Sequence, residues 1–228
     1  SVSIPCVLNE NDYWYCYRTV NEALLELTHY KKGPVQINYV VEDWQLNQFN
    51  TKELPAIKRI DKIDRNDDDI IWESVVEELV KNNRRVIVNC GQNNVIDTAL
   101  MREMEMFYEK TNSIISCDYT SNIRCKGVIF TANILDGVQG EIFDEMCPAL
   151  VISINGQYLS GMKWALKGSK YRFDNWRIEE TGKIVDEFRY LTKLFEMSPI
   201  EFFGIMNKFL KNKEKNEHEY YKLWKEKQ

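Results

Sequence analysis

Two polar turns are the parts of this 228-residue sequence whose residue types could bind a charged ligand. The first turn, Gly91-Gln92-Asn93, directly follows an apolar run that we expect to be a buried strand. In a Rossmann-type sheet this turn would be the phosphate loop, because backbone N–H groups and the positive end of the next helix meet there. It departs from the G-x-G-x-x-G pattern, so a tight strand-to-helix turn with an asparagine cap is the favoured interpretation.

The second turn, residues 155–163, also follows an apolar run and opens a predicted helix. Ser160 could cap that helix, and Lys163 could hold an anion beside its N-terminus. A capped helix with a solvated lysine is the commoner arrangement, and we favour it. If the two turns meet in the fold, the predicted anion or ligand site consists of Gly91, Gln92, Asn93, Ser160 and Lys163.

The sequence motifs of catalysis and of metal binding are absent. There is no G-x-x-x-x-G-K-[ST], no G-x-S-x-G and no H-E-x-x-H. The six cysteines form no C-x-x-C pair, and the two histidines, His29 and His218, fall in an early helix and a charged tail. We therefore predict reduced, mostly buried thiols, no catalytic residue and no metal ligand.

Charge and composition exclude two further classes of protein. The net charge of -5 argues against nucleic-acid binding, which needs a basic face. Basic and aromatic residues do alternate over 170–177, but carboxylates are interspersed there and a half-buried strand explains the pattern better. No window approaches the roughly 18 to 20 consecutive apolar residues of a membrane span, and no signal peptide opens the chain, so we expect a cytoplasmic location.

Apolar segments of strand type alternate with helical patterns along the middle of the chain. This alternation is typical of a doubly wound, mainly parallel Rossmann-like α/β sheet with helices on both faces. Past Asp186, a helical spacing of apolar residues predicts a helix, and Ser198-Pro199 begins another that runs to about Leu210. The predicted strands are 85–90, 113–117, 150–154 and 171–178, with a weaker apolar segment at 128–130, and the predicted helices are 71–83, 95–110, 138–146 and 160–166.

The two ends of the chain differ from this middle part. Residues 18–30 have helical spacing and 35–41 alternate as a strand does, whereas 42–69 are polar and charge-mixed, as in a linker. The tail 211–228 is rich in lysine and glutamate, and we expect an exposed amphipathic helix or a linker there.

The run Gly33-Pro34-Val35-Gln36-Ile37-Asn38, preceded by a helix headed by Arg18, resembles the end of the pyrimidine-binding domain of thiamine-diphosphate-dependent enzymes. The proline that usually follows this strand in the family is replaced here by Tyr39-Val40-Val41. The pattern from Cys147 to Gly156, with Ser160, Lys163, 175–178, Gly182 and Asp186, resembles the central domain of the branch that serves menaquinone biosynthesis.

The resemblance implies a division of the chain: 1–41 as the end of the pyrimidine-binding domain, 42–69 as a linker, 70–210 as the Rossmann-like central domain and 211–228 as a charged helical tail or linker. The parent enzyme would decarboxylate a 2-oxo acid such as 2-oxoglutarate and add the resulting carbanion to isochorismate, as a transferase or carboligase using thiamine diphosphate and Mg. The family's activating glutamate and its G-D-G magnesium motif map to no residue here. We therefore expect a noncatalytic scaffold that holds no cofactor itself.

The resemblance also implies partners. These are the flanking pyrimidine- and diphosphate-binding domains of the parent chain, in a homodimer or tetramer. The alternative from a different class is a standalone regulatory module that binds a nucleotide or a small anion. A deacylase of the sirtuin type is disfavoured, because its zinc cysteine pairs and glycine-rich loop are missing.

Overall fold

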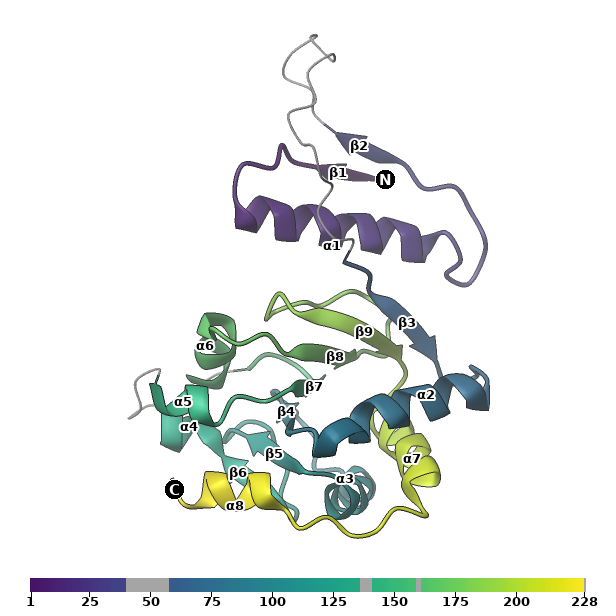
Figure 1. Cartoon of the computed structure of the whole chain (residues 1–228). Helices are drawn as coiled ribbons and strands as arrows, with labels where there is room; N and C mark the ends of the chain where they lie inside the picture. Colours follow the sequence, from purple (N-terminus) through teal and green to yellow (C-terminus); the bar gives the residue numbers. More distant parts are fainter. Residues whose placement is uncertain (40–57, 136–140, 159–160, 228) are drawn as a thin grey trace. The chain divides into compact units, whose positions relative to one another are not determined.

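The computed structural model describes residues 1–39, 58–135, 141–158 and 161–227, and it forms two compact units, Ser1–Asp61 and Lys62–Gln228 (Figure 1). The first unit has a strand β1 (Val2–Ile4), a helix α1 (Glu10–Glu26) and a strand β2 (Ile37–Tyr39) that pairs with β1 in parallel. This is a β-α-β crossover, in which a helix connects two parallel strands. The helix begins at Glu10 rather than at Arg18, because Asn9 caps it by accepting hydrogen bonds from the backbone of Asn11 and Asp12.

One side chain of α1 holds the segment at residues 58–60. The amide of Asn21 donates to the carbonyl oxygens of Tyr17 (2.8 Å) and Lys58 (2.9 Å), and its oxygen accepts from the backbone of Ile60 at 2.9 Å. The Lys58 ammonium lies over the rings of Tyr13 and Tyr17. The segment that follows the undescribed residues is thus attached to α1.

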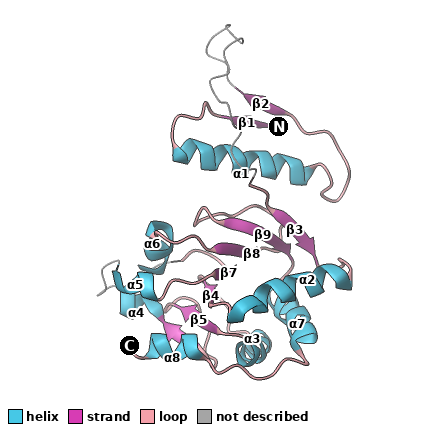
Figure 2. Ribbon diagram, in the orientation of Figure 1, coloured by secondary structure: helices cyan, strands magenta, loops and turns pink. Residues whose placement is uncertain are grey.

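The second unit is built on a seven-stranded sheet of order β3-β9-β8-β7-β4-β5-β6. Figure 2 shows these strands with the helices around them. All neighbours from β9 to β6 pair in parallel. From β4 the chain runs outward to β5 and β6, then returns and runs the other way through β7, β8 and β9, so the predicted doubly wound fold is confirmed. The strands are β3 (Asp61–Asp64), β4 (Val86–Cys90), β5 (Ser113–Cys117), β6 (Val128–Phe130), β7 (Leu150–Ile154), β8 (Asp174–Ile178) and β9 (Leu191–Glu196).

Helices cover both faces of this sheet, and each face has its own apolar core. Val88 faces one core, with Trp72, Phe107 and Phe203 from α2, α3 and α7; Ile87 faces the other, with residues of α4, α5, α6 and α8. Strands β4, β5 and β7 are buried along their whole length, as expected for central parallel strands. The helices are α2 (Asp69–Val80), a 3-10 turn η1 (Lys81–Asn83), α3 (Thr98–Lys110), α4 (Thr131–Leu135), α5 (Glu141–Glu145), α6 (Gly161–Gly168), α7 (Pro199–Leu210) and α8 (Glu219–Lys225).

The helix predicted just past Asp186 is wrong, because Leu191–Glu196 form the strand β9. The pairing with β8 explains the error. Leu191 pairs with Asn175 and Lys193 with the next residue, Trp176, so the register shifts at this point. Such a bulge breaks the two-residue alternation of a strand and produces the three- and four-residue apolar spacing that imitates a helix.

The predicted linker 42–69 falls mostly outside the described residues. Within it, residues 61–64 form β3 at the edge of the sheet and Asp69 begins α2. The division into a pyrimidine-domain remnant, a linker, a central domain and a tail stays a prediction. No helix of the described residues is long and apolar enough to cross a membrane.

Within the predicted tail 211–228, residues 219–225 form the helix α8, and the expectation of an exposed tail is wrong for this helix. Tyr220 and Trp224 of α8 are 1% and 0% exposed, in the core that also contains α4, α5 and α6. The Tyr220 hydroxyl donates to the Met146 carbonyl at 2.6 Å, and its backbone N–H donates to Asn112 at 3.0 Å. Burying two large aromatic rings outweighs the high charge of the surrounding sequence.

The predicted helix at Ser198-Pro199 is confirmed by α7, which starts with a capping box. The Glu201 carboxylate accepts from the backbone and the hydroxyl of Ser198, at 2.9 and 2.7 Å, and pairs with Arg65 at 2.7 Å. The hydrogen bonds from Ser198, and then Arg65, lower the pKa of Glu201 from 4.5 to about 2.

We expect Trp224→Ala to destabilise the second unit by about 3–5 kcal/mol, because it removes a fully buried indole. The matched control is Trp164→Ala on α6, where the side chain is 72% exposed and a change within about 0.5 kcal/mol is expected. Urea unfolding followed by circular dichroism measures both. Equal losses in the two variants would contradict the docking of α8.

We expect Glu201→Gln to lower the melting temperature above pH 4.5 and to have little effect below about pH 2. The folded carboxylate has a lowered pKa, so its stabilisation is present above the unfolded pKa and is lost as the pH falls through the folded one. Glutamine keeps an acceptor for the capping box but carries no charge. Melting curves from pH 2 to 6 test this, and a difference that does not vary with pH would refute it.

Candidate functional site

The two turns predicted to bind a ligand meet where β4 and β7 end. These strands are neighbours at the point where the strand order reverses, which is where ligands bind in open α/β sheets. Here the backbone itself bridges the gap. Gly91 N–H donates to the Ile154 carbonyl (3.0 Å), Gln92 N–H to that of Gln157 (2.9 Å), and Gly156 N–H to that of Gln92 (3.1 Å). We call these joined segments, residues 91–92 and 154–157, the closed switch point.

The glycine at position 91 is required by this close approach. A Cβ placed on Gly91 would lie 2.2 Å from the carbonyl oxygen of Gly156 and 3.1 Å from the ring of Tyr158. A Cβ on Gly156 would lie 3.0 Å from the carbonyl oxygen of Gln92. Glycine therefore serves here to pack two backbones together, and not to leave room for a ligand.

The backbone donors of the first turn are all in use. Gly91 and Gln92 donate within the closed switch point, and Asn93 N–H donates to the Thr120 carbonyl at 3.0 Å. A phosphate loop needs these N–H groups to be free. An anion at this edge would therefore have to be held by side chains.

Of the two remaining predicted site residues, the structure describes Lys163, which lies on α6. Lys163 forms an ion pair with Glu187 at 2.8 Å. Ser160 lies outside the described residues. The structure thus places Gly91, Gln92 and Asn93 on one loop and engages the Lys163 ammonium with a carboxylate, and the anion site itself stays a prediction.

A buried arginine forms hydrogen bonds with the loop residues at the closed switch point. The side chain of Arg177, on β8, is 7% exposed. It donates to the Tyr158 hydroxyl at 2.8 Å, to the Asn155 carbonyl at 2.6 Å and to the Glu179 carboxylate at 2.8 Å. Burial raises the pKa of Tyr158, so its hydroxyl stays protonated and donates to the Ile154 carbonyl at 3.1 Å.

The sequence interpretation missed this role of Arg177, because the residue was grouped with its exposed neighbours Lys170 and Arg172. One signal was available. In a strand, Arg177 lies on the same face as Asn175, and the structure buries both residues. A charged side chain in a buried strand needs hydrogen-bond partners, so its position in the predicted strand 171–178 could have indicated this role.

The prediction that the thiols are mostly buried is wrong, since Cys90 and Cys117 are buried but Cys6 is exposed and the other three cysteines are half-buried. Cys90 and Cys117 end the neighbouring strands β4 and β5 and are each 2% exposed. Burial raises the pKa of Cys90 well above its usual value and that of Cys125 to about 12. At neutral pH these groups are thiols rather than nucleophilic thiolates. Across the described residues, no group of three or more His, Cys, Asp or Glu side chains could hold a metal ion.

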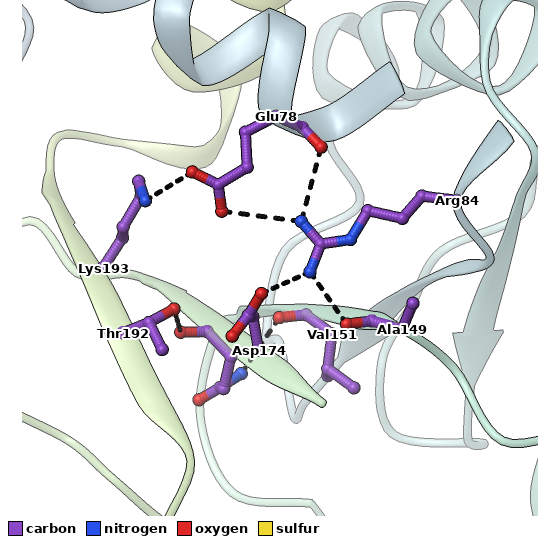
Figure 3. A network of polar contacts seen from close by, with 8 residues as sticks. Glu78, Arg84, Ala149, Val151, Asp174, Thr192 and Lys193 are labelled. Carbon is purple, nitrogen blue, oxygen red and sulfur yellow. Dashed lines mark hydrogen bonds and ion pairs between the residues drawn. The ribbon is translucent and has the colours of Figure 1, made fainter. Parts of the chain in front are cut away.

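A polar groove of about 820 Å³ lies at the opposite, amino-terminal edge of the sheet. Its wall contains an ion-pair network (Figure 3). Arg84 donates to the Glu78 and Ala149 carbonyls and pairs with the carboxylates of Glu78 and Asp174, and Lys193 pairs with Glu78 at 2.7 Å. These contacts connect α2 to β7, β8 and β9. The network therefore ties elements together and leaves the Arg84 charge compensated.

The chain is similar to three bacterial 2-succinyl-5-enolpyruvyl-6-hydroxy-3-cyclohexene-1-carboxylate synthases, although no family model matches it. The identity is 33% over 89% of the chain for the synthase of Bacteroides fragilis, 31% over 98% for that of Bacteroides thetaiotaomicron and 30% over 93% for that of Phocaeicola vulgatus. The resemblance drawn from the sequence is thereby confirmed. The chain spans only 36%, 40% and 38% of the lengths of these relatives.

We expect Gly91→Ala to destabilise the second unit by about 3 kcal/mol, because the new methyl group would force the two loops apart. Gly168→Ala is the matched control, since a Cβ there meets nothing within 4 Å. Chemical denaturation gives the free energy of unfolding of both variants. A Gly91→Ala protein as stable as the control would contradict the closed switch point.

Proposed function

From its homology to the 2-succinyl-5-enolpyruvyl-6-hydroxy-3-cyclohexene-1-carboxylate synthases, we propose that the chain is the noncatalytic central part of a thiamine-diphosphate-dependent decarboxylase or carboligase of that kind. In this proposal the first unit ends the pyrimidine-binding domain, and residues 70–210 hold the flanking domains in place. The parent enzyme is a cytoplasmic homodimer or tetramer in menaquinone biosynthesis. It uses thiamine diphosphate and Mg, which are bound by parts of the parent polypeptide outside these 228 residues.

The observation that carries the scaffold role is the closed switch point. A Rossmann-like domain that binds a nucleotide leaves backbone N–H groups and space at the point where the strand order reverses. Here the N–H groups of Gly91, Gln92 and Gly156 are donated to carbonyl oxygens, and the backbone of one loop contacts that of the other. The same edge is braced by the buried Arg177. The fold is thus rigid where a ligand-binding relative would be open.

The cofactor's diphosphate does not fit the residues of this edge. A diphosphate carries several negative charges, and the backbone donors that would face it are occupied. Lys163, the cation of the predicted site, forms an ion pair with Glu187 at 2.8 Å. Thiamine diphosphate would supply the electron sink for decarboxylation in the parent enzyme, and this chain's contribution is the rigid placement of the domains that bind it.

The alternative, a standalone nucleotide- or anion-binding module, is not favoured. The same occupied donors that oppose a diphosphate oppose a nucleotide. A standalone module would also leave unexplained the 30–33% identity to segments of much longer synthases.

The first test is the mass of the native polypeptide in its source cells, detected with an antibody against residues 84–210. We expect a band of more than twice the 27.1 kDa of this chain. A band at 27.1 kDa would remove the flanking domains from the proposal and refute it.

The second test is titration of the 228-residue chain with thiamine diphosphate and Mg, and separately with ATP, NAD and FAD. We expect no change in melting temperature with any of them. A ligand at 100 times its dissociation constant would add about 2.7 kcal/mol of stability, which is easily detected. Stabilisation by thiamine diphosphate would refute the noncatalytic role, and stabilisation by a nucleotide would favour the alternative.

A further inference from the structure

Three large apolar side chains are exposed beside the closed switch point. Val95 and Ile96, on the loop after β4, are 63% and 67% exposed, and Tyr119, on the loop after β5, is 76% exposed. Single exposed apolar residues are common on protein surfaces, but neighbouring ones mark interaction sites. We call these three residues the edge patch.

Hydrogen bonds hold the two loops of the edge patch side by side. Asn93 N–H donates to the Thr120 carbonyl at 3.0 Å, and the Asn122 side chain donates back to the Asn93 carbonyl. The Ser121 hydroxyl donates to the Cys90 carbonyl at the end of β4, at 2.7 Å. The loops are therefore fixed to each other and to the sheet.

Tyr119 is also held in place although most of its surface is exposed. Its ring stacks on that of Phe130 with centroids 5.6 Å apart, and its hydroxyl donates to Asn133 at 3.2 Å. An aromatic side chain that is already ordered loses little conformational entropy when a partner covers it. The edge patch is thus prepared for a protein contact.

Residues 92–97 and 118–122, which carry the edge patch, include two carboxylates and no cation, and Arg124 and Lys126 lie further along the loop after β5. The two carboxylates on these loops are engaged locally: Asp97 accepts from the first backbone N–H groups of α3, and Asp118 accepts from Thr120 and Ser121. Gln92 and Asn94 are exposed and uncharged. An apolar centre with a neutral polar rim is the composition of a protein interface, whereas a phosphate-bearing ligand needs cations.

We propose that the edge patch docks a flanking domain of the same polypeptide, which covers Val95, Ile96 and Tyr119 with an apolar surface of its own. This inference rests on the proposed function. The match spans only 36–40% of each relative's length, so most of such a polypeptide lies outside this chain and is available to cover the patch. The closed switch point leaves this edge without a backbone anion site, so a protein surface is the favoured occupant.

Hydrogen exchange in the full-length protein and in the 228-residue chain tests the docking. The amides of residues 94–96 and 118–120 should exchange at least tenfold more slowly in the full-length protein. The start of α2 is the internal control, since Ile70 is 77% exposed and is not part of the patch, and its exchange should be the same in both. Equal exchange of the two patch loops in both proteins would overturn the inference.

A pair of variants gives a second readout. The patch variant combines Val95→Ser with Ile96→Ser and keeps Tyr119, whose ring and hydroxyl have partners within the chain. The control combines Ile70→Ser with Tyr171→Ser, which are exposed elsewhere in the same unit. In the 228-residue chain neither should shift the melting temperature. In the full-length protein, only the patch variant should lower the melting temperature. It should also increase the rate of proteolysis between the domains at least tenfold.

The outcomes separate the two proposals. A native band above twice 27.1 kDa with a patch variant that behaves as the control does would overturn the docking and leave the proposed function intact. A band at 27.1 kDa would overturn both. Concentration-dependent dimers of the 228-residue chain that the patch variant abolishes would assign the patch to a second copy and would also overturn the docking.

Discussion

Where β4 and β7 end, two stretches of backbone lie closer together than any side chain between them would permit. The position of the loops that follow depends on this contact between Gly91 and Gly156. It holds residues 154–157 against the start of the loop toward α3, and it uses the donors that the same fold offers to nucleotides in other proteins. The doubly wound sheet thereby keeps its topology, while the crevice in which this fold usually binds ligands is filled by two loops in direct contact.

Two arginines, at opposite edges of the sheet, connect further elements to one another. Arg177 is buried and engages the loop after β7, while Arg84 joins α2 to the starts of β7 and β8. Planar guanidinium groups suit this work, because their fixed donors can bridge several acceptors at once. Removing a partner of the buried Arg177 would leave its charge uncompensated, so the loop after β7 and the strand β8 depend on each other.

Much of the fold could be predicted because the central strands are buried on both faces and therefore read as continuous apolar runs. The ranges 113–117 and 150–154 agree with β5 and β7, and the weaker apolar segment 128–130 forms β6. The local sequence pattern gave the wrong structure where tertiary contacts determine it. A bulge opposite Trp176 gave β9 the apolar spacing of a helix, and the charged residues of the tail suggested exposure although its aromatic rings pack in a core. At the candidate site, sequence placed Gly91 at the correct turn but could not reveal that a second loop would occupy its donors, because that partner is distant in the chain.

The docking of α8 sets an order on the assembly of the domain during translation. Helix α7 packs on one face of the sheet, and α8 then closes the other, with Tyr220 reaching back to Met146 and Asn112. Until Trp224 has left the ribosome, the second face exposes the apolar surface that this indole later covers. The second core is therefore complete only when α8, the last helix of the described residues, has been synthesised and has packed against the sheet.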